Sequence, residues 1–394
     1  YKLLFVAYAE TRGLLPMETP AYRAASLTTM IHWADNAVER RAPLSASTST
    51  TPKYRALLAL FRRLDHGAPE LELLRTEGGL FGATDPNHAF LERHRLSDRA
   101  IARALSALTL EGRWVEAMES LSIRHLCAIG EGLLANGLWV VDAAPGHVAW
   151  VEDRESGHRS LSDPVADYVA ISTVEDVLAP LLSARASDYR DAMDHLVRVR
   201  QRAKEREADR EAPAVRAAVA RAEDAALQAL LGIKVLDPTM GAGHFLIIAA
   251  DAITDWAVAQ HRAYQLAHPE LPESWDPLVN DLVRVRHRIR HRLSSRGLRL
   301  HPGWPDDLAL VARRVAQTCI YGVDRDPLAV SLARANLSLW AFARGGPLPQ
   351  LGDHLYRGDS LLGGRLDDLD LPVWDSVDLF GALSSLSRID AARG

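Results

Sequence analysis

The sequence is poor in cysteine and lacks long apolar segments. Cys127 and Cys319 are its only cysteines in 394 residues, and both stand in apolar contexts. So few thiols exclude a disulfide-stapled secreted fold and favour a reducing, cytoplasmic compartment. No apolar run approaches the roughly 20 residues of a membrane span, so we expect no membrane partner. The first segment, YKLLFVAYAETRGLLP, is too charged for a signal peptide. Because the chain begins with Tyr1 rather than Met, we expect a fragment of a longer protein.

The sequence also lacks an excess of positive charge. Its formal net charge of −5 does not favour a general nucleic-acid binder, although local basic patches remain compatible with DNA contact. The hydrophobic content of 48% and the charged content of 25% are typical of a soluble globular protein. A length of 394 residues allows two or three domains.

Hydrophobic periodicity divides the first 232 residues into two regions. Residues 1–135 are predicted to form a helical N-terminal domain, because LLFVAYAETRGLL and YRALLALFRRL repeat apolar residues at three- and four-residue steps. Residues 136–232 are predicted to form a connector that opens with a hairpin, LWVVDAAPGHVAWVED. STVEDVLAPLL then indicates a helix capped by Ser172 or Thr173. The mixed charges that follow predict a solvated helical arm, with DNA or a partner helix as alternative contacts.

The third region, 233–394, alternates predicted strands and helices. One strand ends at Asp237, TCIYGVD forms a strand ending at Asp324 before a helix that begins near Pro327, and a third strand near HLYRG precedes Asp359. This order predicts an α/β fold with a parallel sheet. Between the first two strands, LVRVRHRIRHRL is basic. It alternates like a strand, but its flanks favour a helix whose arginines face solvent or contact nucleic-acid phosphates.

Three carboxylates are predicted at the ends of the three strands. Asp237, Asp324 and Asp359 should line one crevice, because ligands of such sheets lie beyond the carboxyl ends of the strands. Gly241 and Gly243 remove side chains where backbone approaches a ligand, and the next helix points its free N–H groups there. The alternative roles are a helix N-cap for Asp237, a helix-start charge for Asp324 and a turn former for Asp359.

The pattern around the glycines discriminates between cofactors. A dinucleotide site needs Gly-x-Gly-x-x-Gly and an acid about 20 residues later. Here the third glycine is missing, and Asp324 comes 87 residues after Asp237. A carboxylate in front of the glycines would repel a pyrophosphate. Three carboxylates instead suit a ligand with an amino group, a sulfonium, a ribose and an adenine, which is S-adenosylmethionine.

The motifs resemble those of amino-group DNA methyltransferases. VLDPTMGAGHFL resembles their first motif, Asp-Pro-(Ala)-x-Gly-Ser-Gly-x-Phe, while IYGVDRDPLAVSLARANLSLW and LYRGDSLLGG resemble the second and third. With LLFVAYAETRGLLP, GGLF and LSIRHLCAIGEGLL, the pattern is similar to the large adenine methyltransferases of fused restriction–modification enzymes and of the BREX and DISARM phage-defence systems. The resemblance spans roughly residues 1–365. It implies a Rossmann-like S-adenosylmethionine-dependent sheet in 233–394, behind the helical N-terminal domain.

The resemblance implies a role for each motif residue. Asp237 would bind the methionine amino group of the cofactor, Asp324 both ribose hydroxyls and Asp359 the adenine amino group. Arg325 would lie beside the adenine ring, and Phe245 would pack against the cofactor or hold the loop. The complete set of cofactor-binding candidates is Asp237, Thr239, Met240, Gly241, Ala242, Gly243, His244, Phe245, Asp324, Arg325, Asp359 and Ser360.

Two elements of the family pattern are missing. The aromatic-Thr-Pro segment that closes over the methionine is replaced by SLSDPVADYV, where Pro164 or Tyr168 is the nearest equivalent. The catalytic Asn/Asp-Pro-Pro-Tyr/Phe motif, which grips the flipped target base, does not occur in the 394 residues, and we find no target-recognition domain.

We therefore expect the cofactor-binding half of a methyltransferase, with no catalytic residue of its own. A companion protein or further residues would supply the catalytic motif. The expected partners are double-stranded DNA and other defence-system subunits. The alternative is a non-catalytic subunit that binds the cofactor. We expect no metal, because His287 and His291, although spaced as i and i+4, stand among arginines on a solvated face.

Overall fold

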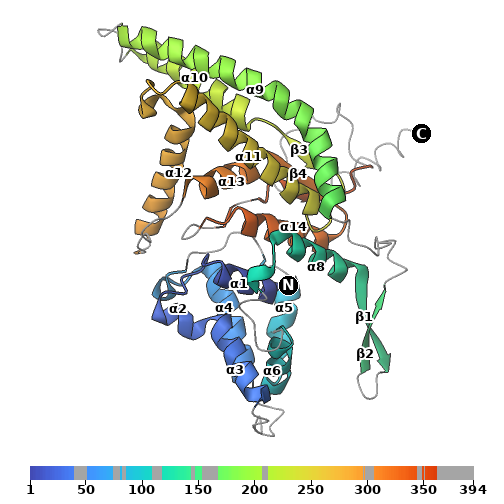
Figure 1. The fold of residues 1–394 in the computed structure, drawn as a ribbon. Helices are drawn as coiled ribbons and strands as arrows, with labels where there is room; N and C mark the ends of the chain where they lie inside the picture. The colour runs from blue at the N-terminus through green and yellow to red at the C-terminus, as the bar shows by residue number, and fades with distance from the viewer. Residues whose placement is uncertain are drawn as a thin grey trace, which may run out of the picture.

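The fold of the chain is given by a computed structural model (Figure 1). It describes residues 1–39, 51–73, 80–81, 86–108, 118–142, 147–152, 167–205, 212–295, 297, 306–343, 348–349 and 351–361. Within these residues the protein is mostly helical, with a small three-stranded parallel sheet and a separate two-stranded hairpin.

Helices form the N-terminal part of the chain, as predicted for the residues described there. They are α1 (Lys2–Thr11), α2 (Pro20–Ala25), α3 (Leu27–Glu39), α4 (Pro52–His66), the 3-10 helix η1 (Pro69–Leu71), α5 (Pro86–Arg93), α6 (Asp98–Ser106) and α8 (Ile123–Ala135). Local signals explain their ends. Ser97 caps α6 by accepting a hydrogen bond from the backbone N–H of Ala100, and α4 stops at Gly67, whose φ is 81°.

The predicted hairpin is confirmed. Strand β1 (Asn136–Asp142) pairs antiparallel with β2 (His147–Glu152), and the register places Asn136 opposite Glu152. Figure 1 shows the hairpin extending from the end of α8, away from the body of the protein.

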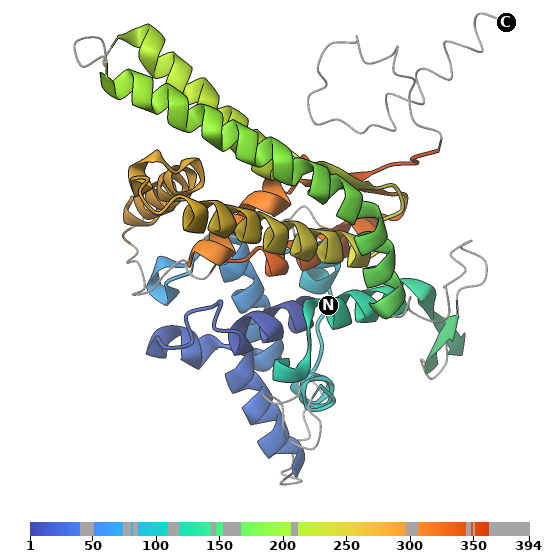
Figure 2. The same ribbon diagram turned by 45° about the horizontal axis from the view of Figure 1, so that its top comes forward.

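A pair of long helices follows, α9 (Asp167–Glu205) and α10 (Pro213–Leu231), which lie side by side in both Figure 1 and Figure 2. The prediction that Ser172 or Thr173 caps a helix is wrong, because α9 already begins at Asp167. Inside the helix, Thr173 Oγ1 donates 2.8 Å to the carbonyl of Val169, the usual way in which a mid-helix threonine satisfies its hydroxyl. One side of α9 is not solvated: it buries Tyr189, Met193 and Leu196.

The parallel sheet consists of β3 (Val235–Asp237), β4 (Ile320–Asp324) and β5 (Leu355–Arg357). Strand β4 is central, and its pairs Asp237↔Gly322 and Asp324↔Arg357 bring the carboxyl ends of all three strands to one edge. The general prediction of parallel strands alternating with helices is therefore confirmed. The connections contain α11 (His244–Ala267), the 3-10 helix η3 (Glu273–Trp275), α12 (Pro277–Ser294), α13 (Asp307–Thr318) and α14 (Pro327–Trp340).

The two faces of this sheet differ in exposure. Ile320, Gly322 and Leu355 are buried on the face that packs against helices. Side chains alternate along a strand, so their neighbours point to the opposite face. There, Leu236 is 60% exposed and Tyr356 is 43% exposed. This second face is therefore partly exposed at β3 and β5.

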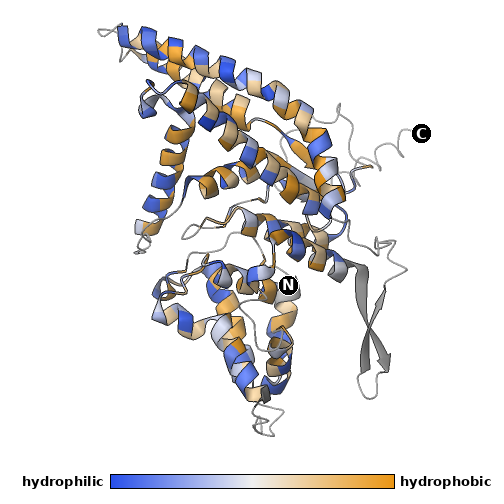
Figure 3. Ribbon diagram, viewed as in Figure 1, coloured by the Kyte–Doolittle hydropathy of each residue, from blue (hydrophilic) through white to orange (hydrophobic). Residues whose placement is uncertain are grey.

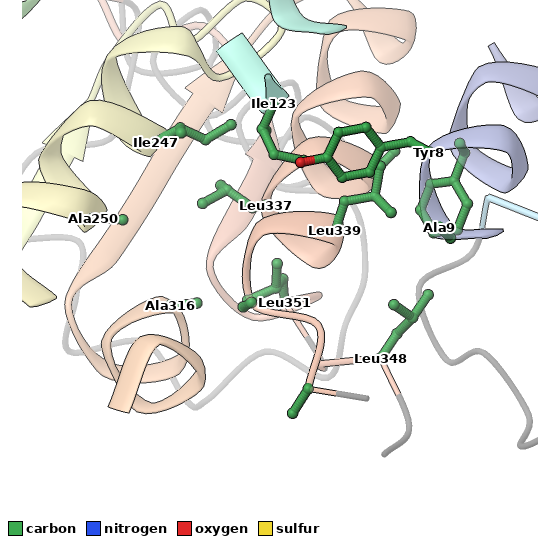
Figure 4. Close-up of a cluster of buried hydrophobic side chains, with 14 of the residues drawn as sticks. Tyr8, Ala9, Ile123, Ile247, Ala250, Ala316, Leu337, Leu339, Leu348 and Leu351 are labelled. Carbon is green, nitrogen blue, oxygen red and sulfur yellow. The ribbon is translucent and has the colours of Figure 1, made fainter. Parts of the chain in front are cut away.

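The buried side chains form one continuous cluster that joins the N-terminal helices to the sheet region. Figure 4 shows Tyr8 of α1 and Ile123 of α8 beside Leu337 and Leu339 of α14. In Figure 3, apolar and polar residues alternate along the helices, as expected for elements with one buried side. Of the helices described, none has both the length and the apolar character that a bilayer crossing requires.

Candidate functional site

The loop between β3 and α11 carries the first predicted motif. Gly241 has a φ of 53° and Gly243 a φ of 89°, both in the left-handed region where glycine is favoured. The backbone N–H of Met240 donates 3.1 Å to the carbonyl of Val323, which ties the loop to the neighbouring strand β4. Asp237 Oδ1 accepts a 3.0 Å hydrogen bond from the N–H of Thr239 and so closes the turn locally.

Asp324, at the end of β4, links the same loop to the next helix. Its Oδ2 accepts from the N–H of Gly241 at 2.9 Å, and its Oδ1 accepts from the N–H of Asp326 at 2.9 Å. Its backbone carbonyl accepts from Gly358, just after β5, at 2.9 Å. One aspartate therefore connects all three strand ends. The sequence predicted that these ends lie together but did not predict the hydrogen bonds that join them.

Helices α14 and α8 hold the buried side of the loop. Asn336 of α14 donates 2.8 Å from Nδ2 to the carbonyl of Ala242, and its Oδ1 accepts from the Tyr1 hydroxyl. A Cβ on Gly130 of α8 would lie only 3.2 Å from Cβ of Ala242, so α8 packs directly against the loop. The loop conformation thus depends on residues far from it in the sequence.

Glu131, which follows Gly130 on α8, is a site residue that sequence reasoning missed. Its Oε1 lies 3.7 Å from the position that a Cβ on Gly241 would occupy. The side chain is half-buried, and this burial raises the pKa of Glu131. The only signal in the sequence is a single acid inside the apolar stretch AIGEGLL. The packing of α8 brings this carboxylate to the glycine loop.

Negative charge concentrates at the loop. Burial raises the pKa of Asp237; the hydrogen bond from Thr239 opposes this shift, and the nearby charge of Asp324 adds to it. With Glu131, three carboxylates surround one loop. Two arginines lie at the same sheet edge: Nε of Arg325, a side chain 76% exposed, is 3.4 Å from Oδ2 of Asp359, and Arg357 pairs with Asp324 in the strand register. The site therefore favours a cationic ligand.

The other predicted residues occupy different environments. Asp359 accepts 3.0 Å from the N–H of Leu361 and has a side chain only 10% exposed, whereas Ser360 and Thr239 are exposed. Met240 is buried, 3% exposed, over Gly322 of β4.

His244 and Phe245 begin α11 on the buried side of the loop. His244 is 3% exposed with Nε2 3.0 Å from Oδ1 of Asp167, and burial lowers its pKa. Phe245 is half-buried and packs on the core. Two residues were the nearest equivalents of the aromatic-Thr-Pro segment. Tyr168 on α9 is 74% exposed, and Pro164 lies outside the described residues.

No group of three or more His, Cys, Asp or Glu side chains within the described part of the chain is arranged to hold a metal ion. His287 and His291 are both exposed on α12.

Comparison of the chain with known protein families, curated proteins and solved structures gave no match.

The arrangement itself limits the possible chemistry. The loop contains two left-handed glycines and leads into the N-terminus of α11, and carboxylates approach it from β3, β4 and α8. Ionised carboxylates only accept hydrogen bonds, so they recognise ammonium, amino and hydroxyl groups. The geometry suits binding and positioning of a ligand.

Proposed function

We propose that this chain is the S-adenosylmethionine-binding part of an adenine-specific DNA methyltransferase with a Rossmann-like sheet. The observation that carries the proposal is the link from Asp324 at the end of β4 to Gly241 in the β3–α11 loop. It joins two of the motifs that resemble the family, at the carboxyl edge of a parallel sheet, where α/β proteins bind ligands. The strand order β3–β4–β5 is also that of one nucleotide-binding half of a doubly wound sheet.

The carboxylates match the polar groups of the cofactor. Asp237 and Glu131 would accept from the methionine ammonium, since both lie at the glycine loop. Asp324 uses one hydrogen bond per oxygen on the backbone, which leaves a lone pair on each oxygen for the two ribose hydroxyls. Asp359 would accept from the adenine amino group, with Arg325 beside the ring.

The bound cofactor supplies an activated methyl group, and transfer to an adenine amino group is an in-line displacement. The residues of this chain contribute to it by position, because they fix the cofactor at the sheet edge. We propose that the Asn/Asp-Pro-Pro-aromatic motif, the target recognition and any other subunits of a restriction or phage-defence complex lie outside these 394 residues. The exposed sheet face with Leu236 and Tyr356 is a suitable surface for that catalytic half. DNA as substrate would place the complex in the cytoplasm.

A second candidate function is a non-catalytic subunit that binds the cofactor as a signal. The observation that favours it is the absence of the catalytic motif from the sequence. A nicotinamide enzyme is disfavoured because the third glycine is missing and because Asp237 and Glu131 would repel a pyrophosphate. Calorimetric titration with S-adenosylmethionine and with NAD distinguishes a methyltransferase cofactor site from a nicotinamide site. Only S-adenosylmethionine is expected to bind.

Residues 1–394 alone are expected to transfer no methyl group to DNA, because the motif that grips a flipped adenine does not occur in their sequence. The measurement is incorporation of labelled methyl into mixed-sequence DNA. The Asp324→Ala variant sets the background. Incorporation by the wild-type chain above that background would show that the catalytic group is already present and that the proposed division of the enzyme is wrong.

Affinity for S-adenosylmethionine is expected to rise with pH. Burial raises the pKa of both Asp237 and Glu131, so these groups stay neutral to a higher pH than the ordinary values of about 4. A cationic ligand favours their ionised forms, and binding must then release protons. Affinity should therefore fall as the pH drops through the raised pKa values.

Calorimetry in buffers of different ionisation enthalpy measures this proton release. The Asp237→Asn, Glu131→Gln double variant should bind more weakly and with a flatter pH profile. If the pH profile of binding is unchanged in that variant, neither carboxylate contacts the ligand.

A further inference from the structure

Helix α12 has a face of one charge sign. Its sequence contains five arginines and one aspartate, a formal charge of +4 with histidine neutral, in a chain whose total is −5. The aspartate, Asp281, is buried; its Oδ2 lies 2.8 Å from Nε of Arg314 on α13, and its Oδ1 lies 3.8 Å from Nη2 of Arg284. Most apolar residues of α12 are buried at three- and four-residue steps. The opposite side of the helix therefore faces solvent. The exposed positions are Val283, Arg284, His287, Arg288, Arg290, His291, Arg292 and Ser294.

The long helix α9 provides a contrast within the same protein. Its exposed charges alternate in sign, with acids at Glu175 and Asp191 and arginines at Arg190 and Arg198. Mixed signs are the ordinary composition of a solvated surface. The exposed face of α12 instead contains no acid, and Arg288 and Arg290 form no ion pair with any described residue. Solvation alone does not account for this difference.

The chemistry of the face points to a polyanion with repeated phosphates. All its permanently charged groups are arginines, whose planar forks bind phosphate oxygens in pairs and hold their charge at any physiological pH. From Arg284 to Arg292 the helix rises about 12 Å, which corresponds to roughly three to four phosphate intervals along one DNA strand. Figure 1 shows α12 at the edge of the molecule, away from the sheet.

We propose that the exposed face of α12 (Arg284, Arg288, Arg292 and their neighbours) is a sequence-independent docking surface for the phosphate backbone of duplex DNA. The choice of DNA rather than another polyanion rests on the proposed function. The face fixes the orientation of the duplex on the complex and reads no bases, because phosphate contacts carry no sequence information directly.

The test compares two triple variants of the full chain with the same loss of charge. Arg284→Gln, Arg288→Gln, Arg292→Gln alters the α12 face. Arg93→Gln, Arg99→Gln, Arg103→Gln alters exposed arginines of α5 and α6. Glutamine is a good helix former, so both variants should keep the wild-type circular dichroism spectrum and thermal midpoint.

Fluorescence anisotropy with a short labelled duplex then gives the dissociation constant between about 50 and 200 mM salt. The α12 triple is expected to lower the slope of log K against log salt by about 3, one for each lost phosphate contact, and equally for unrelated sequences. The α5–α6 triple should retain the wild-type slope. Equal losses in both triples, or no loss in the α12 triple, would overturn the proposal.

Two further measurements separate this inference from the proposed function. S-adenosylmethionine should bind the α12 triple as it binds the wild type. If the wild-type chain binds DNA through α12 but no S-adenosylmethionine, the proposed function fails and the docking surface stands. Co-sedimentation with anionic phospholipid vesicles that is lost in the α12 triple, while DNA affinity is unchanged, would assign the face to a membrane and contradict our proposal.

Discussion

Replacing Asp324 with alanine is expected to weaken binding of S-adenosylmethionine at least about 100-fold. The ribose would lose two hydrogen bonds to a charged acceptor, each worth roughly 1.5–3 kcal/mol, and 1.4 kcal/mol is about a factor of ten. The loop would lose its own bond from Gly241 to the same carboxylate. Calorimetric titration of purified wild-type and variant chains measures the change.

Asp326→Ala is the matched control, because it removes the same group two residues away. The Asp326 carboxylate accepts 2.7 Å from the N–H of Leu328 and caps α14. Its loss should lower the free energy of unfolding by about 1 kcal/mol and leave the affinity near that of the wild type. Wild-type affinity in Asp324→Ala would exclude Asp324 from the ligand site, and an equal loss in both variants would trace the effect to the start of α14.

The second large effect is expected at Gly322, in the centre of β4. A Cβ there would lie 2.4 Å from Sδ of Met240 and 2.9 Å from Cδ1 of Leu246, distances that require neighbours to move. Overpacking of this kind typically destabilises a protein by about 1–3 kcal/mol. Because Met240 belongs to the glycine loop, Gly322→Ala should also displace the loop and lower ligand affinity. Urea unfolding and calorimetry measure the two consequences separately.

Gly132→Ala makes the same chemical change where space is open. Apart from its own helix, no atom of the described residues lies within 4 Å of the added methyl group, and the residue is inside helix α8. Alanine there should stabilise the protein by roughly 0.5–1 kcal/mol through helix propensity. If Gly322→Ala unfolds at the same urea concentration as the wild type, then the loop and β4 are less tightly packed than the structure shows.

The strands and the glycine loop were predictable because their signals are local. A β-rich run before Asp237, turn residues after it, and Pro327 at the first position of α14 each act within a few residues. The basic helix α12 was also predicted, from the sequence on either side of it. In the structure its apolar residues are buried at three- and four-residue steps, which is the period of a helix. Local patterns suffice where the period of the apolar residues and the turn chemistry agree.

Other features depend on contacts that no local pattern contains. Glu131 reaches the site because α8 packs on Ala242 through Gly130, more than a hundred residues away in the sequence. The start of α9 was misplaced because Thr173 is compatible with a cap or, as found, with a hydroxyl bonded to the preceding turn. The bond from Gly241 to Asp324 depends on the left-handed backbone of the loop.

The two backbone hydrogen bonds to Asp324 also bear on the entropy of ligand capture. An aspartate free to rotate must give up its rotamers when a ligand arrives, and this cost weakens binding. Here the N–H groups of Gly241 and Asp326 fix both carboxylate oxygens in the folded chain, so the ordering takes place on folding. Binding then needs little rearrangement, and these two amides should already exchange their hydrogens slowly in the ligand-free protein. The site would act as a rigid template, and its selectivity would be set before the ligand enters.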